Sequence, residues 1–357
     1  MTTSIFAFII VLGVLIFVHE LGHFLAARLF GVGVEKFSLG FGPRIFGKTV
    51  GITDYRISAI PLGGFVKMVG EEPDAEIDPK DIPISFTHKH VFKRILIVAA
   101  GPSFNLLLAV FIFFTIFLFS GMYLLRPTIG EVKDGTPAHK AELAKGDTIA
   151  AIDGVEIKSW EEMAGMISES KGKKLSLIVR RGEDSFVKEI VPEPIKSKNL
   201  FGEDIDRYVI GVTASGDVFT KRLNLPEAFI ESIAQAYKIT ELTILSIVKL
   251  IQGTLSAKTL GGPIMIAEMA GQQAKEGAMN LVFFIALLSI NLGILNFLPI
   301  PVLDGGHLMF FFIEAIIGRP VNTRMREIAQ QVGIFVLIML MVFVFYNDIS
   351  RVFFGKS

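Results

Sequence analysis

The sequence predicts a membrane α-helical protein with four transmembrane helices, a β-hairpin that dips toward the bilayer, and one α/β domain outside the membrane. Three observations predict this fold class. Of the 357 residues, 51% are hydrophobic, and the mean hydropathy is +0.56, which is high for a soluble protein of this length. Long uncharged apolar runs recur along the chain. Between them lie stretches with the alternation and turn residues of small sheets.

The first apolar run, residues 1–30, is long enough to span a membrane only if polar side chains lie inside it. Residues 5–18 are unbroken apolar sequence, but a spanning helix needs about 20 residues. The span therefore has to include a His-Glu pair and a second histidine. A secretory signal peptide is the alternative, and it is disfavoured because no Lys or Arg precedes Arg28 and no small-residue cleavage site follows the run.

Three further apolar runs predict the remaining spans, at 91–125, 279–307 and 328–350. The apolar segment 308–317 is too short to cross and carries Glu314. Lys and Arg are concentrated in the loop between the first two spans and in the loop between the last two. The positive-inside rule makes both loops cytoplasmic. Both termini, and the long segment between the second and third spans, are then extracytoplasmic.

Three regions outside the spans have patterns of their own. Residues 31–70 alternate apolar and polar side chains around many glycines, which predicts a β-hairpin with glycine bends beside the first span. Residues 126–215 alternate short strand and helix patterns and have the length of one small α/β domain. Residues 225–275 place apolar side chains at helical spacing, which predicts an amphipathic segment on the outer membrane face.

Composition limits the partners and the kinds of site. Lys and Arg together number 35, as do Asp and Glu, so the formal net charge is zero and gives no electrostatic basis for binding nucleic acid. The lipid bilayer is the expected surrounding. There is no cysteine, which excludes disulfides and Cys-ligated metals. His, Asp and Glu remain as possible metal ligands.

A metal-binding motif lies within the first predicted span. The sequence His19-Glu20-Leu21-Gly22-His23 is HExxH, and its i, i+4 spacing puts both imidazoles on one helix face. Glu20 is placed to take a proton from a water on a shared metal, as in zinc proteases. Ionisable groups inside a span are costly in lipid, which favours a functional role over a structural one.

The third ligand has to come from elsewhere in the chain at a similar depth. Asp304, in the sequence LDGGH at the end of the third span, is the first candidate, and His307 is the rival. Asp304 can also be interpreted as an ordinary N-cap of the helix that follows. The pair Gly305-Gly306 would let backbone approach closely.

Polar and helix-breaking residues in the third span suggest a substrate site. Pro299 and Pro301 break the helix, and broken helices at membrane depth commonly line a site. Asn291 and Asn296 can hydrogen-bond an extended substrate backbone, or can pack helices together. For Asn105 in the second span, helix packing is the preferred interpretation.

Taken together, these residues resemble the site-2 protease family of intramembrane zinc metalloproteases, in its bacterial RseP-like group. The resemblance covers nearly the whole chain. It rests on HELGH at 19–23, GFGPRIF at 40–46, PLGGFVKM at 61–68, GPSFN at 101–105, LGGPI at 260–264 and NLGILNFLPIPVLDGGH at 291–307.

The resemblance implies roles for particular residues. His19, His23 and Asp304 would bind Zn²⁺, and Glu20 would be the catalytic base. Residues implied to contact substrate are Asn291, Asn296, Gly40, Gly42, Pro299 and Pro301. Residues 31–70 would be a membrane-reentrant β-hairpin, and 126–215 a PDZ domain, a single one where the best-known Gram-negative members have two.

The resemblance also implies a reaction and a location. The chain would perform regulated intramembrane proteolysis of single-pass proteins in a bacterial inner membrane, with its active site toward the cytoplasm and its PDZ domain outside. Its substrates would be anti-sigma factors after a first cleavage, or signal-peptide remnants. Two other hypotheses stay open: a metal transporter using the same four polar residues, and an inactive membrane scaffold that presents the PDZ domain.

Overall fold

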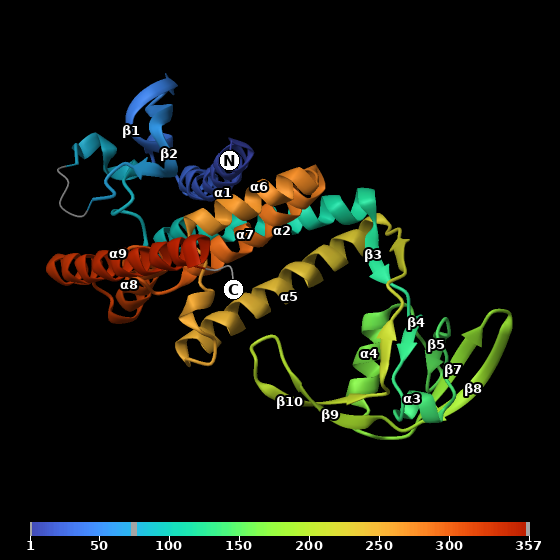
Figure 1. Cartoon of the computed structure of the whole chain (residues 1–357). Helices are drawn as coiled ribbons and strands as arrows, with labels where there is room; N and C mark the ends of the chain where they lie inside the picture. Colours follow the sequence, from blue (N-terminus) through green and yellow to red (C-terminus); the bar gives the residue numbers. More distant parts are fainter. Residues whose placement is uncertain (1, 73–76, 355–357) are drawn as a thin grey trace. The chain divides into compact units, whose positions relative to one another are not determined.

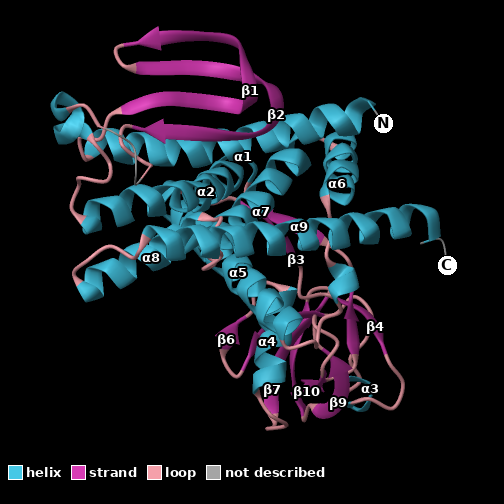
Figure 2. Cartoon of the chain, turned by 90° about the vertical axis from the view of Figure 1, so that its left-hand side faces the viewer, coloured by secondary structure: helices cyan, strands magenta, loops and turns pink. Residues whose placement is uncertain are grey.

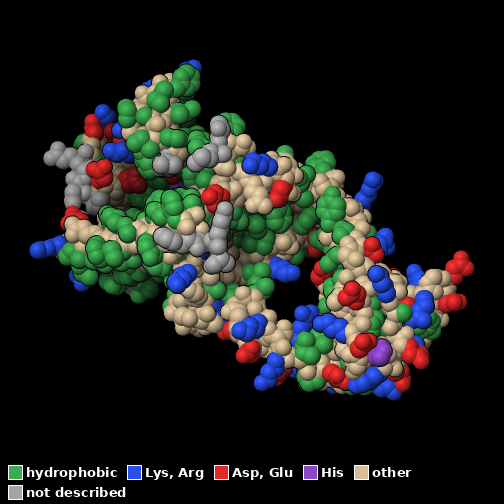
Figure 3. Space-filling view, in the orientation of Figure 1, with side chains coloured by type: hydrophobic (Ala, Val, Ile, Leu, Met, Phe, Trp, Pro, Cys, Tyr) green, Lys and Arg blue, Asp and Glu red, His purple; other side chains and the backbone are tan. Residues whose placement is uncertain are grey.

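The computed structural model describes residues 2–72 and 77–354. This part of the chain contains four helices long and apolar enough to cross a membrane: α1 (Thr2–Leu29), α2 (Val91–Ser120), α7 (Ala278–Phe297) and α9 (Thr323–Phe354) (Figure 1). Many of their apolar side chains face outward, as on α9, where Phe335 is 64% exposed and Val342 is 61% exposed. Apolar surface of this extent is suited to lipid, and it is visible over the helices in Figure 3.

Two of the predicted spans end earlier than expected. The second, predicted as 91–125, leaves the helix at Ser120, because Gly121 adopts a positive φ of 73° and the apolar residues after it form strand β3 (Met122–Leu125). The third, predicted as 279–307, leaves the helix at Phe297. Proline cannot donate a helical hydrogen bond and restricts the residue before it, so Pro299 and Pro301 end the helix there. The chain turns tightly and starts α8 (Asp304–Ile317).

The chain divides into two compact units. The first contains α1, α6, α7, α8 and α9, most of α2 and the strands β1 (Val34–Val50) and β2 (Thr53–Met68). A buried apolar core joins the end of α1, the two strands, the start of α2 and α8. Its members include Ala27, Val34, Val66, Ile97, Leu308 and Phe311.

The predicted hairpin 31–70 is present but is folded back on itself. Residues 36–39 of β1 pair on one side with 64–67 of β2 and on the other with 54–57 of the same strand. Residues 44–50 pair with 53–58, so four chain segments lie side by side (Figure 2). A short 3-10 helix, η1 (Pro79–Ile84), follows the sheet. The segment 64–68 is an outer edge, since no other described strand pairs with its free side.

The predicted amphipathic segment 225–275 is two helices. They are α5 (Leu225–Ile251) and α6 (Pro263–Glu276), joined by a turn that contains the 3-10 helix η2 (Ala257–Thr259). Helix α6 packs against α1 and α7. Its first turn is fixed by Asp348 of α9, a buried carboxylate that accepts the backbone N–H groups of Gly262 at 2.9 Å and Ile264 at 3.0 Å. Negative charge at a helix N-terminus is stabilising.

The second unit contains the predicted α/β domain. Its central sheet has the order β6-β5-β7-β8 and is accompanied by three two-stranded pairs: β3 with β12, β4 with β11, and β9 with β10. The core is apolar and includes Ile129, Ile149, Met163, Leu177 and Val179. The bounds of its elements are β4 (Ile129–Val132), α3 (Pro137–Lys140), β5 (Thr148–Ile152), β6 (Val155–Glu156), α4 (Trp160–Glu169), β7 (Leu175–Arg181), β8 (Asp184–Ile190), β9 (Glu193–Lys198), β10 (Asp204–Val209), β11 (Val212–Ala214) and β12 (Val218–Lys221).

Candidate metal centre

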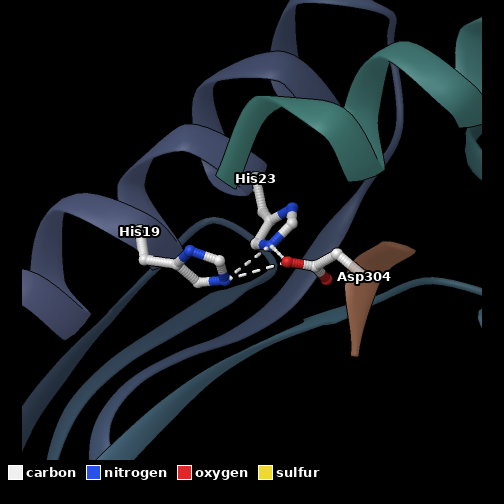
Figure 4. Close-up of side chains that lie close together, drawn as sticks. All are labelled: His19, His23 and Asp304. Carbon is white, nitrogen blue, oxygen red and sulfur yellow. Dashed lines mark hydrogen bonds and ion pairs between the residues drawn. The ribbon is translucent and has the colours of Figure 1, made fainter. Parts of the chain in front are cut away.

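Three potential ligand atoms converge at one point between α1 and α8. His19 and His23 project from one face of α1 toward Asp304 (Figure 4). The distance between the two Nε2 atoms is 3.3 Å, and Oδ2 of Asp304 is 3.1 Å from Nε2 of His19 and 3.5 Å from that of His23. Zinc–nitrogen bonds of about 2.0–2.1 Å in a tetrahedron separate the ligands by roughly 3.3–3.4 Å. The triangle therefore has the size that a zinc ion needs.

The surroundings of Asp304 support a cation at this point. Its Oδ2 atom is buried and has no hydrogen-bond partner within residues 2–72 and 77–354, although it faces two imidazole nitrogens. A buried carboxylate oxygen without a partner is costly. A metal ion shared with the two histidines would satisfy it, and two imidazoles with one carboxylate are a donor set that zinc accepts.

Local backbone geometry places Asp304 here. Asp304 is the first residue of α8 and Leu303 is the N-cap, so the interpretation of Asp304 as an N-cap is wrong. The turn before it packs directly on the start of α8. A Cβ at Gly305 would lie 2.2 Å from the carbonyl oxygen of Leu298, and one at Gly306 would lie 2.3 Å from that of Ile300. The close backbone approach predicted for this glycine pair is confirmed.

The ring of His23 is oriented by α2. Its Nδ1 atom is 3.0 Å from the backbone carbonyl oxygen of Ile97, to which it can donate, leaving Nε2 free for a metal. The ring lies directly against Gly101, where a Cβ would be 2.2 Å from Nε2. Glycine at this position therefore provides the space for the ring.

The ring of His19 is flanked by two asparagines. Nδ2 of Asn105 is 3.2 Å from its Nδ1 atom, and Nδ2 of Asn296 is 3.5 Å from the same atom. Asn296 thus lies beside a candidate metal ligand, and its contact with substrate stays a prediction. Asn105 is there as well, although sequence reasoning preferred a packing role. Its position three residues after Pro102, in a helix that also carries Gly101, was the signal available.

Glu20 lies on the side of the centre that faces β2. Its carboxylate lies beside the backbone of Val66, and its Cγ lies 3.1 Å from where a Cβ at Gly64 would be. A cavity of about 600 Å³ opens here. It is lined by Glu20, His19, His23 and Asp304 and by the free edge of β2, residues 64–68.

Other predicted site residues lie elsewhere. Asn291 accepts a hydrogen bond of 2.9 Å from Thr243 of α5, which is helix packing. Gly40 and Gly42 have positive φ angles of 91° and 85° at the bend of β1 and do not line the cavity. Pro299 and Pro301 form the turn before Asp304 and do not line it either.

His307 lines the cavity but is not within the three-atom cluster. Among the described residues, the cluster that could hold a metal contains Asp304 and not its rival.

Helix α8, which carries both Asp304 and His307, is joined to α2 by an ion pair between Arg94 and Glu314. The guanidinium of Arg94 also lies 4.9 Å from the ring centre of Phe311. This ion pair holds α8, the helix that begins at Asp304, against α2.

Comparisons with known proteins cover nearly the whole chain. The model of peptidase family M50 matches residues 7–340. Two similar proteins are each named "putative zinc metalloprotease": one from Mesorhizobium japonicum is 36% identical over 96% of this chain and 97% of its own, and one from Campylobacter jejuni is 40% identical over 97% and 93%. The regulator of sigma-W protease RasP from Bacillus subtilis is 31% identical over 98% and 99%.

One solved structure also matches a part of the chain. The PDZ domain of an SdrC-like protein from Listeria monocytogenes is 27% identical, covers 24% of this chain and 84% of its own, and has a TM-score of 0.20. The assignment of residues 126–215 as a PDZ domain stays a prediction.

Proposed function

The chain belongs to peptidase family M50, and on that premise we propose that it is a multi-pass membrane zinc endopeptidase whose metal is held by His19, His23 and Asp304. The observation that carries the assignment of ligands is the triangle of donor atoms with sides of 3.1, 3.3 and 3.5 Å. Two of its corners come from a helix with the length and composition of a membrane span. The names of the similar proteins from Mesorhizobium and Campylobacter support zinc as the metal.

The chemistry follows from the groups around the cavity. When bound, zinc would polarise the scissile carbonyl and acidify a water. Glu20 takes the proton of the attacking water and delivers it to the leaving amine nitrogen. Backbone atoms support these groups: the carbonyl oxygen of Ile97 orients His23, and the backbone of Val66 lies beside the Glu20 carboxylate. Asn296 takes no part in these steps, and its proposed role is to contact the substrate.

The free edge of β2 is suited to an extended substrate. Its residues 64–68 line the cavity beside Glu20, and their outer backbone groups have no strand partner among the described residues. A peptide that adds there as a strand would run past the metal centre. A helix hides its peptide bonds in internal hydrogen bonds, so a membrane-spanning substrate has to unwind before it is cut. Gly64, rather than Gly40 or Gly42, is the glycine at this edge.

The membrane setting defines the substrate class. His23 is six residues before the end of α1 at Leu29, or about 9 Å along the helix, which puts the metal within the span. The topology predicted from basic residues places that end at the cytoplasmic face of a bacterial inner membrane and the domain 126–215 outside. The sheet β1–β2, whose residues Phe41, Ile45 and Phe46 are exposed, would enter the bilayer beside α1.

The proposed substrates are single-pass membrane proteins. The Bacillus relative is named "Regulator of sigma-W protease RasP", which supports anti-sigma factors as one class. Their trimming by an earlier protease is what the family resemblance implies. Signal-peptide remnants have the same chemistry, an apolar helix with one end near the cytoplasmic face. Family membership favours this function over a metal transporter or an inactive scaffold.

The test uses the detergent-solubilised full chain and a single-pass substrate. Glu20→Gln is expected to keep its zinc and to lose cleavage, because the amide cannot accept the proton. Asp304→Asn is expected to lose zinc, whereas His307→Ala is expected to retain it. Equal cleavage by Glu20→Gln and the wild type would refute the proposed catalytic base. Zinc loss in His307→Ala and full retention in Asp304→Asn would refute the ligand set.

A further inference from the structure

A buried asparagine beside the metal centre has an unpaired oxygen. Asn105 is 0% exposed, and its Oδ1 atom has no hydrogen-bond partner among the residues that the structure describes. Its Nδ2 atom is instead directed at Nδ1 of His19, 3.2 Å away. Nothing in the proposed reaction uses this side chain, yet burying an amide without pairing its oxygen costs free energy.

The tautomer of His19 determines whether its Nδ1 atom needs a hydrogen-bond donor or an acceptor. If Nε2 of His19 offers its lone pair to a metal, its Nδ1 atom carries the proton and is a donor. A donor requires an acceptor, and the amide –NH2 groups now facing Nδ1 are donors as well. Rotating the Asn105 amide by half a turn about Cβ–Cγ exchanges its two ends. The unpaired Oδ1 then accepts the Nδ1–H.

We propose that Asn105 is a positioning residue for His19, whose side-chain carbonyl accepts the imidazole Nδ1–H and holds Nε2 toward the metal. This inference rests on the proposed ligand set. It gives His19 the kind of support that His23 receives from the carbonyl oxygen of Ile97, at 3.0 Å. Partners of this kind fix the tautomer and the ring orientation of metal-binding histidines.

Burial and anchoring favour Asn105 over Asn296 for this role. Asn296 is only half-buried and lies farther from Nδ1, at 3.5 Å against 3.2 Å. Asn105 is also fixed through its backbone, because its carbonyl oxygen accepts a 2.7 Å hydrogen bond from the buried hydroxyl of Ser289 on α7. Asn296, which has no such backbone anchor from Ser289, stays available to substrate.

The test compares zinc retention in the full-length, detergent-solubilised protein. Asn105→Leu removes both polar atoms and keeps a branched side chain, although a larger one. Asn105→Ala removes them without adding bulk, and Asn105→Asp keeps an acceptor oxygen. Ser289→Ala serves as the control for the unfolding temperature alone, since it removes a buried hydrogen bond from the same helix pair while keeping the Asn105 side-chain amide beside His19. The rate of zinc loss to a chelator is measured, together with the visible absorption of the Co²⁺-substituted protein and the unfolding temperature of the zinc-free protein.

We expect Asn105→Leu and Asn105→Ala to lose zinc about 10- to 100-fold faster than the wild type, the usual effect of removing such a partner. Their Co²⁺ spectra should change, while their zinc-free unfolding temperatures stay close to that of Ser289→Ala. Asn105→Asp should retain zinc like the wild type. A purely structural asparagine would lower the unfolding temperature of the zinc-free protein and leave the Co²⁺ spectrum unchanged.

The outcomes separate this inference from the proposed ligand set. His19→Ala is measured in the same series. If it loses zinc while Asn105→Leu and Asn105→Ala hold zinc as long as the wild type, the positioning role is refuted and the ligand set stands. If His19→Ala itself retains zinc, the ligand set is refuted. Equally fast loss from Asn105→Asp and Asn105→Leu would also overturn the role of the acceptor.

Discussion

Replacing Gly101 by alanine should remove zinc while leaving the fold intact. The added Cβ would lie 2.2 Å from Nε2 of His23, 2.5 Å from Cε1 and 2.8 Å from Cδ2. Carbon atoms in favourable contact are about 3.5–4.0 Å apart. The new Cβ would be about 1 Å too close to the His23 ring, so the ring would have to move by at least that distance. Zinc-ligand distances vary by only about 0.2 Å. The ring cannot make that movement and remain a ligand.

The size of the effect follows from this displacement. A misplacement of about 1 Å at a reacting group typically costs about 100-fold, and we expect at least that loss in zinc affinity. At about 1.4 kcal/mol for each tenfold change, this is about 2.8 kcal/mol. The helix itself should not suffer, because alanine is a better helix former than glycine by about 1 kcal/mol.

The assay is zinc content after dialysis against a graded chelator, together with cleavage of a single-pass substrate. Gly13→Ala is the matched control: Gly13 is also a glycine within a spanning helix, and a Cβ there would meet nothing within 4 Å. We expect Gly13→Ala to bind zinc and to cleave like the wild type. A Gly101→Ala protein with normal zinc affinity and activity would refute the placement of His23 against α2.

Two further predictions concern other parts of the molecule. Gly64→Ala should reduce cleavage but keep zinc. The new Cβ would lie 3.1 Å from Cγ of Glu20, 2.7 Å from Cγ2 of Ile16 and 2.9 Å from the carbonyl oxygen of Ser38, so it would press on the base and on the sheet rather than on a ligand. Zinc loss from this variant would contradict that separation. In the domain 126–215, the fully buried carboxylate of Asp147 accepts hydrogen bonds from Arg181 at 2.7 and 2.8 Å and from the backbone N–H of Ala144 at 2.8 Å. Burial alone would raise the pKa of Asp147, but these hydrogen bonds outweigh it and hold the pKa below its usual value. The pair therefore stabilises the domain above the unfolded-state pKa of about 3.9 and ceases to do so as the pH falls through the lower folded-state pKa. Asp147→Asn should cost about 1–3 kcal/mol at neutral pH and lose less stability on acidification than the wild type. Urea unfolding followed by the fluorescence of Trp160, the only tryptophan in the chain, measures both within the full-length protein; parallel acid profiles for the two proteins would contradict it.

Local sequence patterns predicted the part of the site that is itself local. The HExxH spacing sufficed to place His19 and His23 together, because both lie on one helix whose periodicity is known. The helix-breaking prolines predicted the end of α7, although the helix stops at Phe297, before the prolines, rather than continuing toward Asp304. Hydropathy alone cannot distinguish an apolar helix from an apolar strand, which is why 121–125 was included in the second span.

Features that depend on long-range pairing were not predicted. Alternation identified strands in 31–70, but it does not say which segments pair, so the double-sided pairing of residues 36–39 went unforeseen. The position of Asn105 depends on where α2 crosses α1, and no pattern within α2 contains that information. For the same reason the sequence does not distinguish Asn291 from Asn296. In the structure Asn291 is hydrogen-bonded to Thr243, whereas Asn296 lies beside His19.

The crossing of α1 and α2 links these observations into one geometric requirement. A Cβ at Gly22 would be 2.5 Å from the carbonyl oxygen of Ala100, so the two helices are in backbone contact there. Small residues permit such contact between helices in lipid, where the hydrophobic effect cannot drive association. Ile97, Gly101 and Asn105 follow each other at four-residue spacing and therefore share one face of α2.

That face of α2 packs against the face of α1 that carries His19 and His23. Ile97 and Gly101 contact His23, and Asn105 contacts His19, so the order along α2 is opposite to that along α1. A shift of either helix by one residue would disturb both contacts together, because the α2 neighbours of His23 and of His19 lie on the same face of that helix. Zinc affinity should therefore depend on the α1–α2 contact as well as on the ligands, and replacing Gly22 by a larger residue should lower it without altering any atom that binds the metal.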